Sequence, residues 1–176
     1  MKTKLPKDFV VSAICLIVAI VLPFWTGQIP EIGSMMCPMH IPVLLCGYYC
    51  GSLWGMGTGA VAALLRSLMF GMPQFFPQAV CMAFELAAYG FAMGFLREKW
   101  KEVKLGIFAM LLGSMAVGRV VWGLAMFICP GFNPAKFGFE DFFAEAITNA
   151  VPGIVVQFAL IPIFIMVVNN MKKGNE

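Results

Sequence analysis

Four ionisable side chains stand inside stretches of the chain that are otherwise apolar, namely Arg66, Glu85, Arg119 and Glu145. A charge in an apolar medium such as a membrane interior costs at least about 2.5–3.5 kcal/mol, so it is usually paired or functional. Two of the four are positive and two are negative. They could therefore hold the polar groups of a small molecule, or they could neutralise each other within the protein.

Polar and aromatic residues share helical faces with two of these charges. Residues three, four or seven positions apart lie on one face of an α-helix. Gln78 and Cys81 have this spacing relative to Glu85, and Trp122 lies three residues beyond Arg119. Each stripe combines hydrogen-bonding groups with a thiol or an aromatic surface, which is typical of a site for a small molecule.

Two amides follow the last charge. Asn149 lies four residues beyond Glu145, and Gln157 lies two turns further along the same segment. The Pro152–Gly153 pair between them can interrupt a helix and free backbone groups. The amides could contact a ligand, or they could join neighbouring helices by hydrogen bonds.

The elements that position these residues are expected to be transmembrane helices. The chain has 176 residues, of which 61% are hydrophobic and 12% are charged. Because each span requires about 20 apolar residues, roughly six spans fit and no soluble domain does. We predict an all-α bundle in a single domain, 1–176, with spans at about 9–27, 39–53, 54–72, 77–96, 105–128 and 145–168. The first apolar run has no small-residue cleavage site after it, so it is expected to be a retained helix.

The basic residues predict the orientation. Six spans place the N-terminus, the 97–104 loop and the C-terminus on one face, which then holds nine of the twelve basic residues: Lys2, Lys4, Lys7, Arg97, Lys99, Lys101, Lys104, Lys172 and Lys173. Positive residues mark the cytoplasmic side, so both termini are expected in the cytoplasm of a multi-pass plasma-membrane protein. The opposite face holds three connections rich in Gly, Pro and aromatic residues, which suit either anchoring in the headgroups or a cover over a pocket.

Several function classes are disfavoured. The sequence holds no catalytic motif and no phosphate-binding loop, so we predict no catalytic residues and no cofactor. The soft donors Met35, Met36, Cys37, Met39 and His40 would suit copper(I), but adjacent ligands lack a chelating spacing, and no metal site is predicted. The six cysteines include no CxxC pair and are expected to be packing residues. Because the basic residues follow topology, the net charge of +3 does not indicate nucleic-acid binding.

Four segments resemble a known family in order along the chain: MHIPVLLCGYYCG, GTGAVAALLRSLMFGMP, MAFELAAYGFAMGFL and ITNAVPGIVVQFALIP. They are similar to the substrate-binding S components of energy-coupling-factor (ECF) vitamin transporters, and the six spans and cytoplasmic ends agree with that family. The resemblance implies capture of a scarce micronutrient in an outward pocket beneath the outer loops. It also implies that the protein then topples in the membrane against a T component, which two cytoplasmic ATPases drive.

The resemblance also implies a site. The regions that contact ligand in that family contain, in this sequence, Trp25, Gln28, His40, Gln78, Glu85, Arg119, Trp122, Asn149 and Gln157. Arg119 would attract a carboxylate, carbonyl or phosphate, and the tryptophans would stack on the ligand. Arg66 and Glu85 could instead form an ion pair, either structural or against the ligand. Cys15 and Ala19 stand where the family has a pair of small residues that docks on the T component.

The predicted function is therefore uptake of a small water-soluble vitamin or a related precursor by an ATP-driven importer. Riboflavin, pantothenate, a B6 vitamer and a queuosine precursor all remain open as ligands. The alternatives are a self-sufficient carrier or channel for a small solute or metal ion, and an intramembrane enzyme. The absence of an obvious inverted repeat argues against a complete secondary transporter.

Overall fold

Helices are the only regular secondary structure among the described residues. A computed structural model of the chain describes residues 5–24, 38–100, 106–129 and 151–173. Its elements are α1 (Leu5–Val21), η1 (Leu22–Phe24), α3 (His40–Cys50), α4 (Ser52–Phe70), η2 (Phe75–Ala79), α5 (Val80–Trp100), α6 (Gly106–Ile128) and α8 (Val151–Lys173). Within these ranges, five helical segments are long and apolar enough to cross a membrane, and α3 is shorter. The predicted all-α membrane bundle is confirmed.

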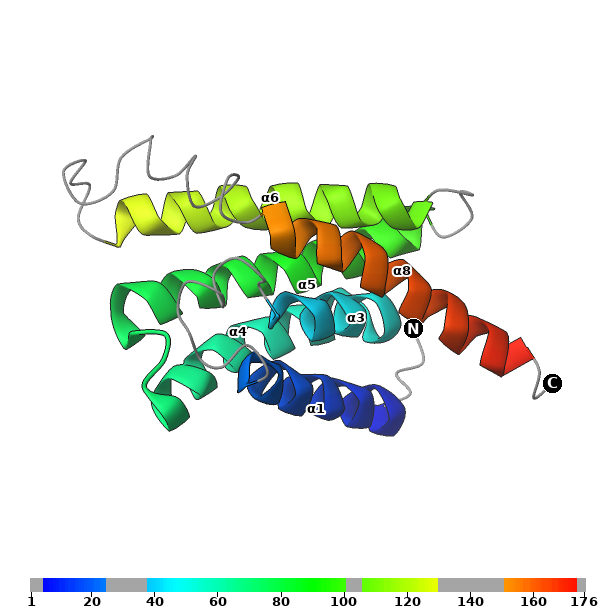
Figure 1. Ribbon diagram of the computed structural model, residues 1–176, viewed down its shortest axis with the longest axis horizontal. Helices are drawn as coiled ribbons and strands as arrows, with labels where there is room; N and C mark the ends of the chain where they lie inside the picture. The colour runs from blue at the N-terminus through cyan, green and yellow to red at the C-terminus, as the bar shows by residue number, and fades with distance from the viewer. Residues whose placement is uncertain (1–4, 25–37, 101–105, 130–150, 174–176) are drawn as a thin grey trace.

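Gly51 separates α3 from α4. Its φ of 94° and ψ of 177° lie in a region that only glycine adopts without strain, and its N–H still donates to the Gly47 carbonyl at 3.1 Å. The chain therefore reverses within a single residue, and α4 runs back along α3 (Figure 1). The predicted second span, 39–53, extends across this reversal, whereas α3 ends at Cys50.

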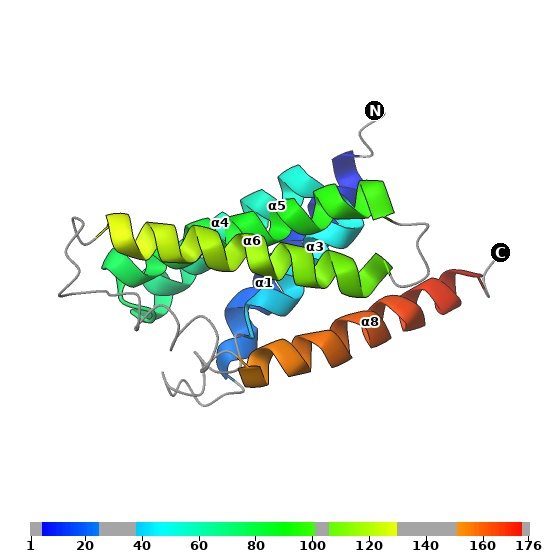
Figure 2. The same cartoon turned by 90° about the horizontal axis from the view of Figure 1, so that it is seen from above.

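This topology brings four helix ends together at one end of the bundle. The start of α1, the end of α5, the start of α6 and the end of α8 lie at the same end of the bundle in both views (Figures 1 and 2). Three of the described basic residues, Lys7, Arg97 and Lys99, belong to this end. Arg97 and Lys99 each lie over an aromatic ring, Tyr48 and Phe95, at 4.7 and 4.5 Å from the ring centroids. We expect this end to face the cytoplasm.

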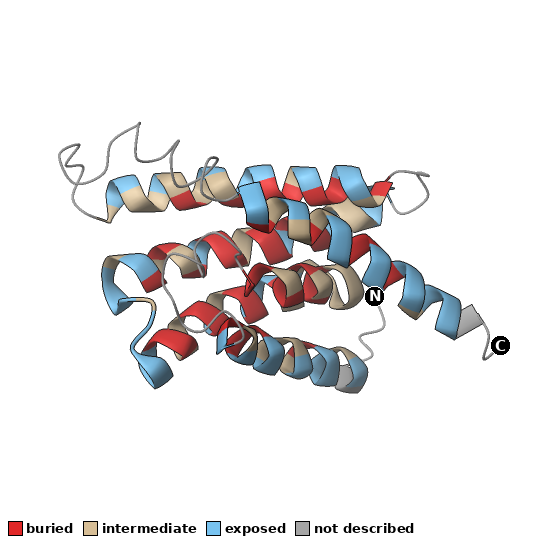
Figure 3. Cartoon of the chain, in the orientation of Figure 1, coloured by how far each residue is buried: buried red, intermediate tan, exposed pale blue. Residues whose placement is uncertain are grey.

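The apolar surface matches a lipid environment. Large hydrophobic side chains such as Ile17, Leu68, Leu112 and Val155 are more than half exposed on the outer faces of their helices. Buried residues instead concentrate on α3, α4 and α5 in the middle of the bundle (Figure 3). The helices therefore present apolar side chains both inward and outward, as expected where the surrounding solvent is hydrocarbon.

Glycines allow α3, α4 and α5 to pack backbone against backbone. A Cβ atom on Gly55 of α4 would lie 2.6 Å from both the Gly47 Cα of α3 and the Gly90 carbonyl oxygen of α5. A Cβ on Gly90 would collide with the Gly55 carbonyl, and one on Gly59 would collide with the Leu86 carbonyl. This glycine seam (Gly47, Gly55, Gly59 and Gly90) brings the three helices to a separation that no larger residue permits.

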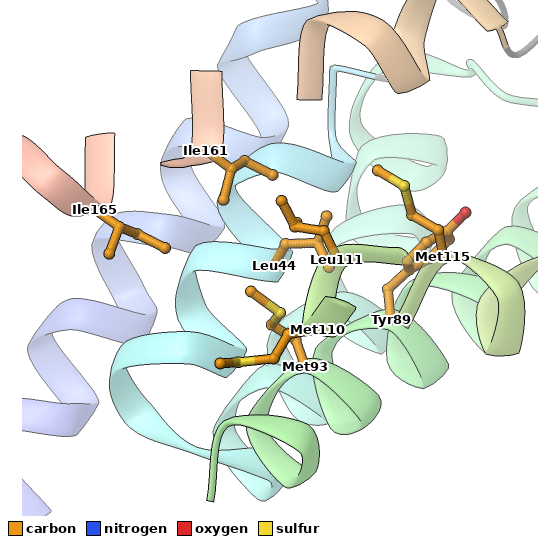
Figure 4. Packing of buried hydrophobic residues seen from close by; sticks show 8 residues of the cluster. All are labelled: Leu44, Tyr89, Met93, Met110, Leu111, Met115, Ile161 and Ile165. Carbon is orange, nitrogen blue, oxygen red and sulfur yellow. The ribbon is translucent and has the colours of Figure 1, made fainter. Parts of the chain in front are cut away.

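A hydrophobic cluster joins α6 and α8 to α3 and α5. Its members come from α3, α5, α6 and α8 and are Leu44, Tyr89, Met93, Met110, Leu111, Met115, Ile161 and Ile165 (Figure 4). Four of the eight are methionine or tyrosine, whose flexible or flat side chains fill irregular gaps between helices. This central cluster fixes α6 and α8 against the three helices that the glycine seam holds.

The glycine seam generates a prediction about stability. Gly55→Ala should lower the free energy of unfolding by about 1–3 kcal/mol, because the added methyl meets backbone that cannot move aside. Gly57→Ala is the matched control, since nothing lies within 4 Å of its Cβ position. Thermal unfolding of both variants in detergent measures the difference. Equal losses of stability would show that the seam is not under steric constraint.

Candidate ligand-binding site

One buried stripe of α5 carries the polar centre of the bundle. Cys81, Glu85, Tyr89 and Met93 follow one another at intervals of four residues, and all are buried. This spacing keeps the four side chains on one face of the helix. Glu85 is therefore placed inside the protein with apolar or weakly polar neighbours above and below it, and it requires partners from other helices.

The antiparallel helix α6 supplies partners at each level of this stripe. Trp122 packs with Cys81, Arg119 meets Glu85, and Met115 packs with Tyr89 in the central cluster. The charged layer thus lies between a layer of thiol and indole and the methionine-rich central cluster. The charged layer belongs to the half of the bundle opposite the basic residues at the start of α1 and the end of α5.

Glu85 contacts two basic side chains through one oxygen. Its Oε1 lies 3.2 Å from Nη1 of Arg119 and 3.4 Å from Nε2 of His40, the first residue of α3. The side chains of Glu85 and His40 are 3% exposed, whereas that of Arg119 is 17% exposed. The three residues form a buried polar triad from three helices, and Arg119 is its accessible member.

Tyr89 and Gly118 position the histidine. The rings of His40 and Tyr89 meet edge to face, with centroids 4.7 Å apart. A Cβ on Gly118 of α6 would lie 2.6 Å from the Tyr89 ring, so glycine at this position gives the ring its space. Since Tyr89 is buried in the central cluster, the imidazole is held by packing as well as by charge.

Trp122 forms an aromatic wall beside the triad. It is buried against Cys81, with Ala125, Met126 and Cys129 packed around it. Because Trp122 lies three residues beyond Arg119 in α6, the indole and the guanidinium occupy the same side of the helix. The predicted neighbourhood of Arg119 and Trp122 therefore lies on the inner face of the bundle.

Gln157 faces inward from α8. It is buried and lies one turn before Ile161, a member of the central cluster. His40 likewise lies one turn before Leu44, which belongs to the same cluster, and α3 and α8 begin at the same end of the bundle (Figure 1). Gln157 is thus on the face of α8 that turns toward the bundle, in the half that contains the triad.

Gln78 does not share the buried stripe of Glu85. It lies in η2 and is exposed, although its spacing predicted a common face with Cys81 and Glu85. The N–H of Ala79 donates to the Gln74 carbonyl at 2.9 Å, five residues back, and Phe76 has non-helical dihedrals. Since a π turn holds more residues than an α turn, the α-helical spacing does not apply before Val80.

The buried arginine of α4 has different partners from those expected. Arg66 donates from Nη1 to the Ile20 carbonyl at 2.7 Å, and its guanidinium lies 5.4 and 5.8 Å from the ring centroids of Phe24 and Phe70. The Ile20 carbonyl lies in the last turn of α1, where helical acceptors lack partners and carry partial negative charge. Arg66 thus fastens α1 to α4, and the oxygen of Glu85 pairs with Arg119 and His40 instead.

Of the two small residues of α1, Ala19 faces inward. Ala19 is fully buried and packs with Val43, Ala62 and Ala63, whereas Cys15 is partly exposed. The outward face of α1 carries Ile14, Ile17, Val18 and Val21, which are exposed. Close approach at Ala19 is therefore used within the bundle.

The remaining predicted site residues, Trp25, Gln28 and Asn149, lie outside the described residues, as does Glu145. Among the residues that the structure describes, no group of three or more His, Cys, Asp or Glu side chains is arranged to hold a metal ion.

Sequence spacing did not reveal the contact of His40 with Glu85 or the role of Tyr89. The spacing of four residues from Glu85 could have indicated Tyr89. The contact with His40 could not be found in this way, because His40 comes from another helix.

These features define a class of protein: a polytopic membrane bundle with a polar site enclosed by its helices. The chain matches the family model of the ECF transporter substrate-specific component over residues 7–169, and it belongs to that family. The resemblance noted in the sequence is confirmed, and so is the assignment as a multi-pass plasma-membrane protein. Neither a curated protein nor a solved structure matches the chain.

The triad generates a prediction about coupling. Glu85→Gln removes the charge that faces Arg119, and loss of one partner of a buried pair typically costs about 3–5 kcal/mol. We expect the double variant Glu85→Gln, Arg119→Gln to recover part of this loss, because neither charge is then left alone. A double-mutant cycle from thermal or denaturant unfolding in detergent measures the coupling. Strictly additive losses would show that the two side chains do not stabilise each other.

Proposed function

We propose that this chain is the substrate-capture subunit of an ATP-driven importer for a small water-soluble vitamin or a related precursor. The observation that carries the proposal is the accessible guanidinium of Arg119 beside buried Glu85, His40 and Trp122. Membership of the family of substrate-specific components supports the role of a binding subunit. The sequence holds no phosphate-binding loop, so ATP hydrolysis would be the work of two partner ATPases that act through a T component.

Each side chain of the site has a chemical role in this proposal. Arg119 donates to a carboxylate, carbonyl or phosphate of the ligand, and Trp122 offers an aromatic surface for a ring. Glu85 holds Arg119 in place and is available to an amine, while Gln157 offers an amide from α8. Trp25, Gln28, Gln78 and Asn149 are proposed to complete the site.

The mechanism requires that the bundle move as a unit. In the proposed cycle, the loaded subunit reorients in the membrane against the T component and releases the ligand on the cytoplasmic side. The glycine seam and the central cluster give the rigidity that such a motion needs, because they join α3, α4, α5, α6 and α8 by backbone contact and dense packing. Docking on the T component is proposed for the region of α1 around Cys15 and Ala19, with the exposed residues of that helix making the contact.

Affinity purification and uptake measurements test the subunit assignment. The chain expressed in its source cells should co-purify with one T component and two ATPases, and ligand uptake should stop when the catalytic glutamate of the ATPases is replaced. Mass spectrometry of small molecules released from the gently purified chain identifies the ligand. Uptake by the isolated chain in liposomes would contradict the proposal and favour a self-sufficient carrier.

Substitution of Arg119 tests the site. Arg119→Gln should weaken binding of the compound identified by mass spectrometry by about 10–100-fold, because a hydrogen bond to a charged group is worth about 1.5–3 kcal/mol. Arg97→Gln is the matched control, since Arg97 lies over Tyr48 at the other end of the bundle. Isothermal titration on folded, monodisperse protein measures both affinities. Unchanged affinity in Arg119→Gln would make Arg119 a structural residue.

A further inference from the structure

One buried cation of the bundle is not part of the triad. Arg66 of α4 is 5% exposed, and its Nη1 donates to the Ile20 carbonyl at 2.7 Å. The rings of Phe24 and Phe70 lie against the guanidinium, with centroids 5.4 and 5.8 Å from its Cζ. A carbonyl oxygen and an aromatic face carry only partial negative charge, so these partners do not neutralise the full positive charge of Arg66.

The acidic side chains of the described residues lie elsewhere. Asp8 stands in the first turn of α1 and Glu98 in the last turn of α5, both at the end of the bundle that we expect to face the cytoplasm. Glu85 belongs to the triad. Within the described ranges, Arg66 is therefore a buried cation without a carboxylate. An anion from outside these ranges would lower the cost of holding such a charge in an apolar medium.

Arg66 lies near the opposite end of the bundle, which we expect to face outward. It is four positions before Phe70, the last residue of α4, which corresponds to about 6 Å along the helix axis. Its hydrogen-bond acceptor, Ile20, is likewise one position before the last residue of α1. Arginine side chains near the end of a membrane helix can extend along their alkyl chains to the headgroup level. The guanidinium is therefore within reach of outer-leaflet headgroups.

The two rings lie on the lipid side of this contact. Phe24 is 40% exposed and Phe70 is 39% exposed, and they meet edge to face with centroids 4.9 Å apart. Val21 and Leu68, beside them on α1 and α4, are at least half exposed. Aromatic side chains at the ends of membrane helices typically border the headgroups. Because exposed side chains change rotamer rapidly, either ring can turn aside and admit an anion to the guanidinium.

A lipid phosphate fits this position better than the transported ligand does. The triad and Trp122 belong to α3, α5 and α6, whereas the partners of Arg66 come from α1, η1 and α4. A guanidinium carries several N–H donors in a planar fork, and the Ile20 carbonyl accepts from one nitrogen. Two oxygens of a phosphate match that fork.

We propose that Arg66 binds the phosphate of an anionic phospholipid in the outer leaflet, with Phe24 and Phe70 bordering the headgroup. The bound lipid neutralises the buried cation and ties the end of α4 to the end of α1, which already meet at the Ile20 carbonyl. An anionic lipid is favoured over a zwitterionic one, because the cationic headgroup of the latter already offsets its phosphate. This partner is additional to the transported ligand and does not depend on which ligand that is.

Native mass spectrometry of the chain in detergent measures lipid binding directly. Phosphatidylglycerol is the anionic probe, and phosphatidylcholine with the same acyl chains is the zwitterionic one. The first phosphatidylglycerol should bind more tightly than the first phosphatidylcholine. Equal affinities for the two lipids would overturn the proposal, because the buried cation would then make no use of an anionic lipid.

Thermal unfolding distinguishes a lipid from a free anion, since a molecule that binds only the folded protein raises the Tm. Phosphatidylglycerol should raise the Tm of the chain in detergent. Sodium phosphate should not raise it beyond sodium chloride at matched ionic strength. A rise with sodium phosphate that equals the rise with phosphatidylglycerol would indicate a site for free phosphate and would contradict a lipid site.

Variants assign the binding to Arg66. Arg66→Gln should weaken binding of the first phosphatidylglycerol by about 10–100-fold, the range expected for a hydrogen bond between charged groups. Arg97→Gln is the matched control, because it removes a guanidinium that lies over Tyr48 at the other end of the bundle, and it should keep the affinity. If Arg66→Gln does not fold, Arg66→Lys keeps the charge without the planar fork and should also bind more weakly than the wild type. Unchanged affinity in the Arg66 variant that folds, or an equal loss in Arg97→Gln, would overturn the proposal.

Discussion

The close packing of α4 against α5 is the constraint on which the rest of the structure depends. At Gly55 and Gly90 the two backbones meet directly, and Gly47 brings α3 to the same seam. No hydrophobic driving force between helices exists in lipid, so van der Waals contact at such seams supplies much of the association. Because α3 and α5 are fixed there, His40 at the start of α3 reaches Glu85 on α5.

Arg66 and Arg119 show two ways in which a charge within an apolar bundle is stabilised. Arg66 is held by a carbonyl at the end of α1 and by two phenylalanine rings, which lock one helix onto another. Arg119 is held by a carboxylate that it shares with a histidine, and its own side chain stays partly accessible. Both arrangements offset the cost of burial, but Arg66 is buried whereas Arg119 keeps part of its side chain exposed.

Much of the fold could be read from the residues alone. Hydropathy and the distribution of lysine and arginine predict an all-α membrane bundle, because lipid demands long apolar helices and the basic residues gather at one face. The stripe that links Cys81 to Glu85 was also predictable, since α5 is regular. The exposed position of Gln78 was not predictable, because Gln78 lies in a π turn before that helix, where the α-helical spacing does not apply.

The sequence by itself determined the class of the protein and the residues that needed an explanation, since a charge within an apolar span stands out whatever surrounds it. Only the tertiary structure decided which charges meet. Glu85 could have paired with Arg66 or Arg119, and the packing of α3, α5 and α6 gives it Arg119 and His40. Partner choice depends on the rotation and separation of helices, which the glycines and the central cluster set together, and no single helix carries that information.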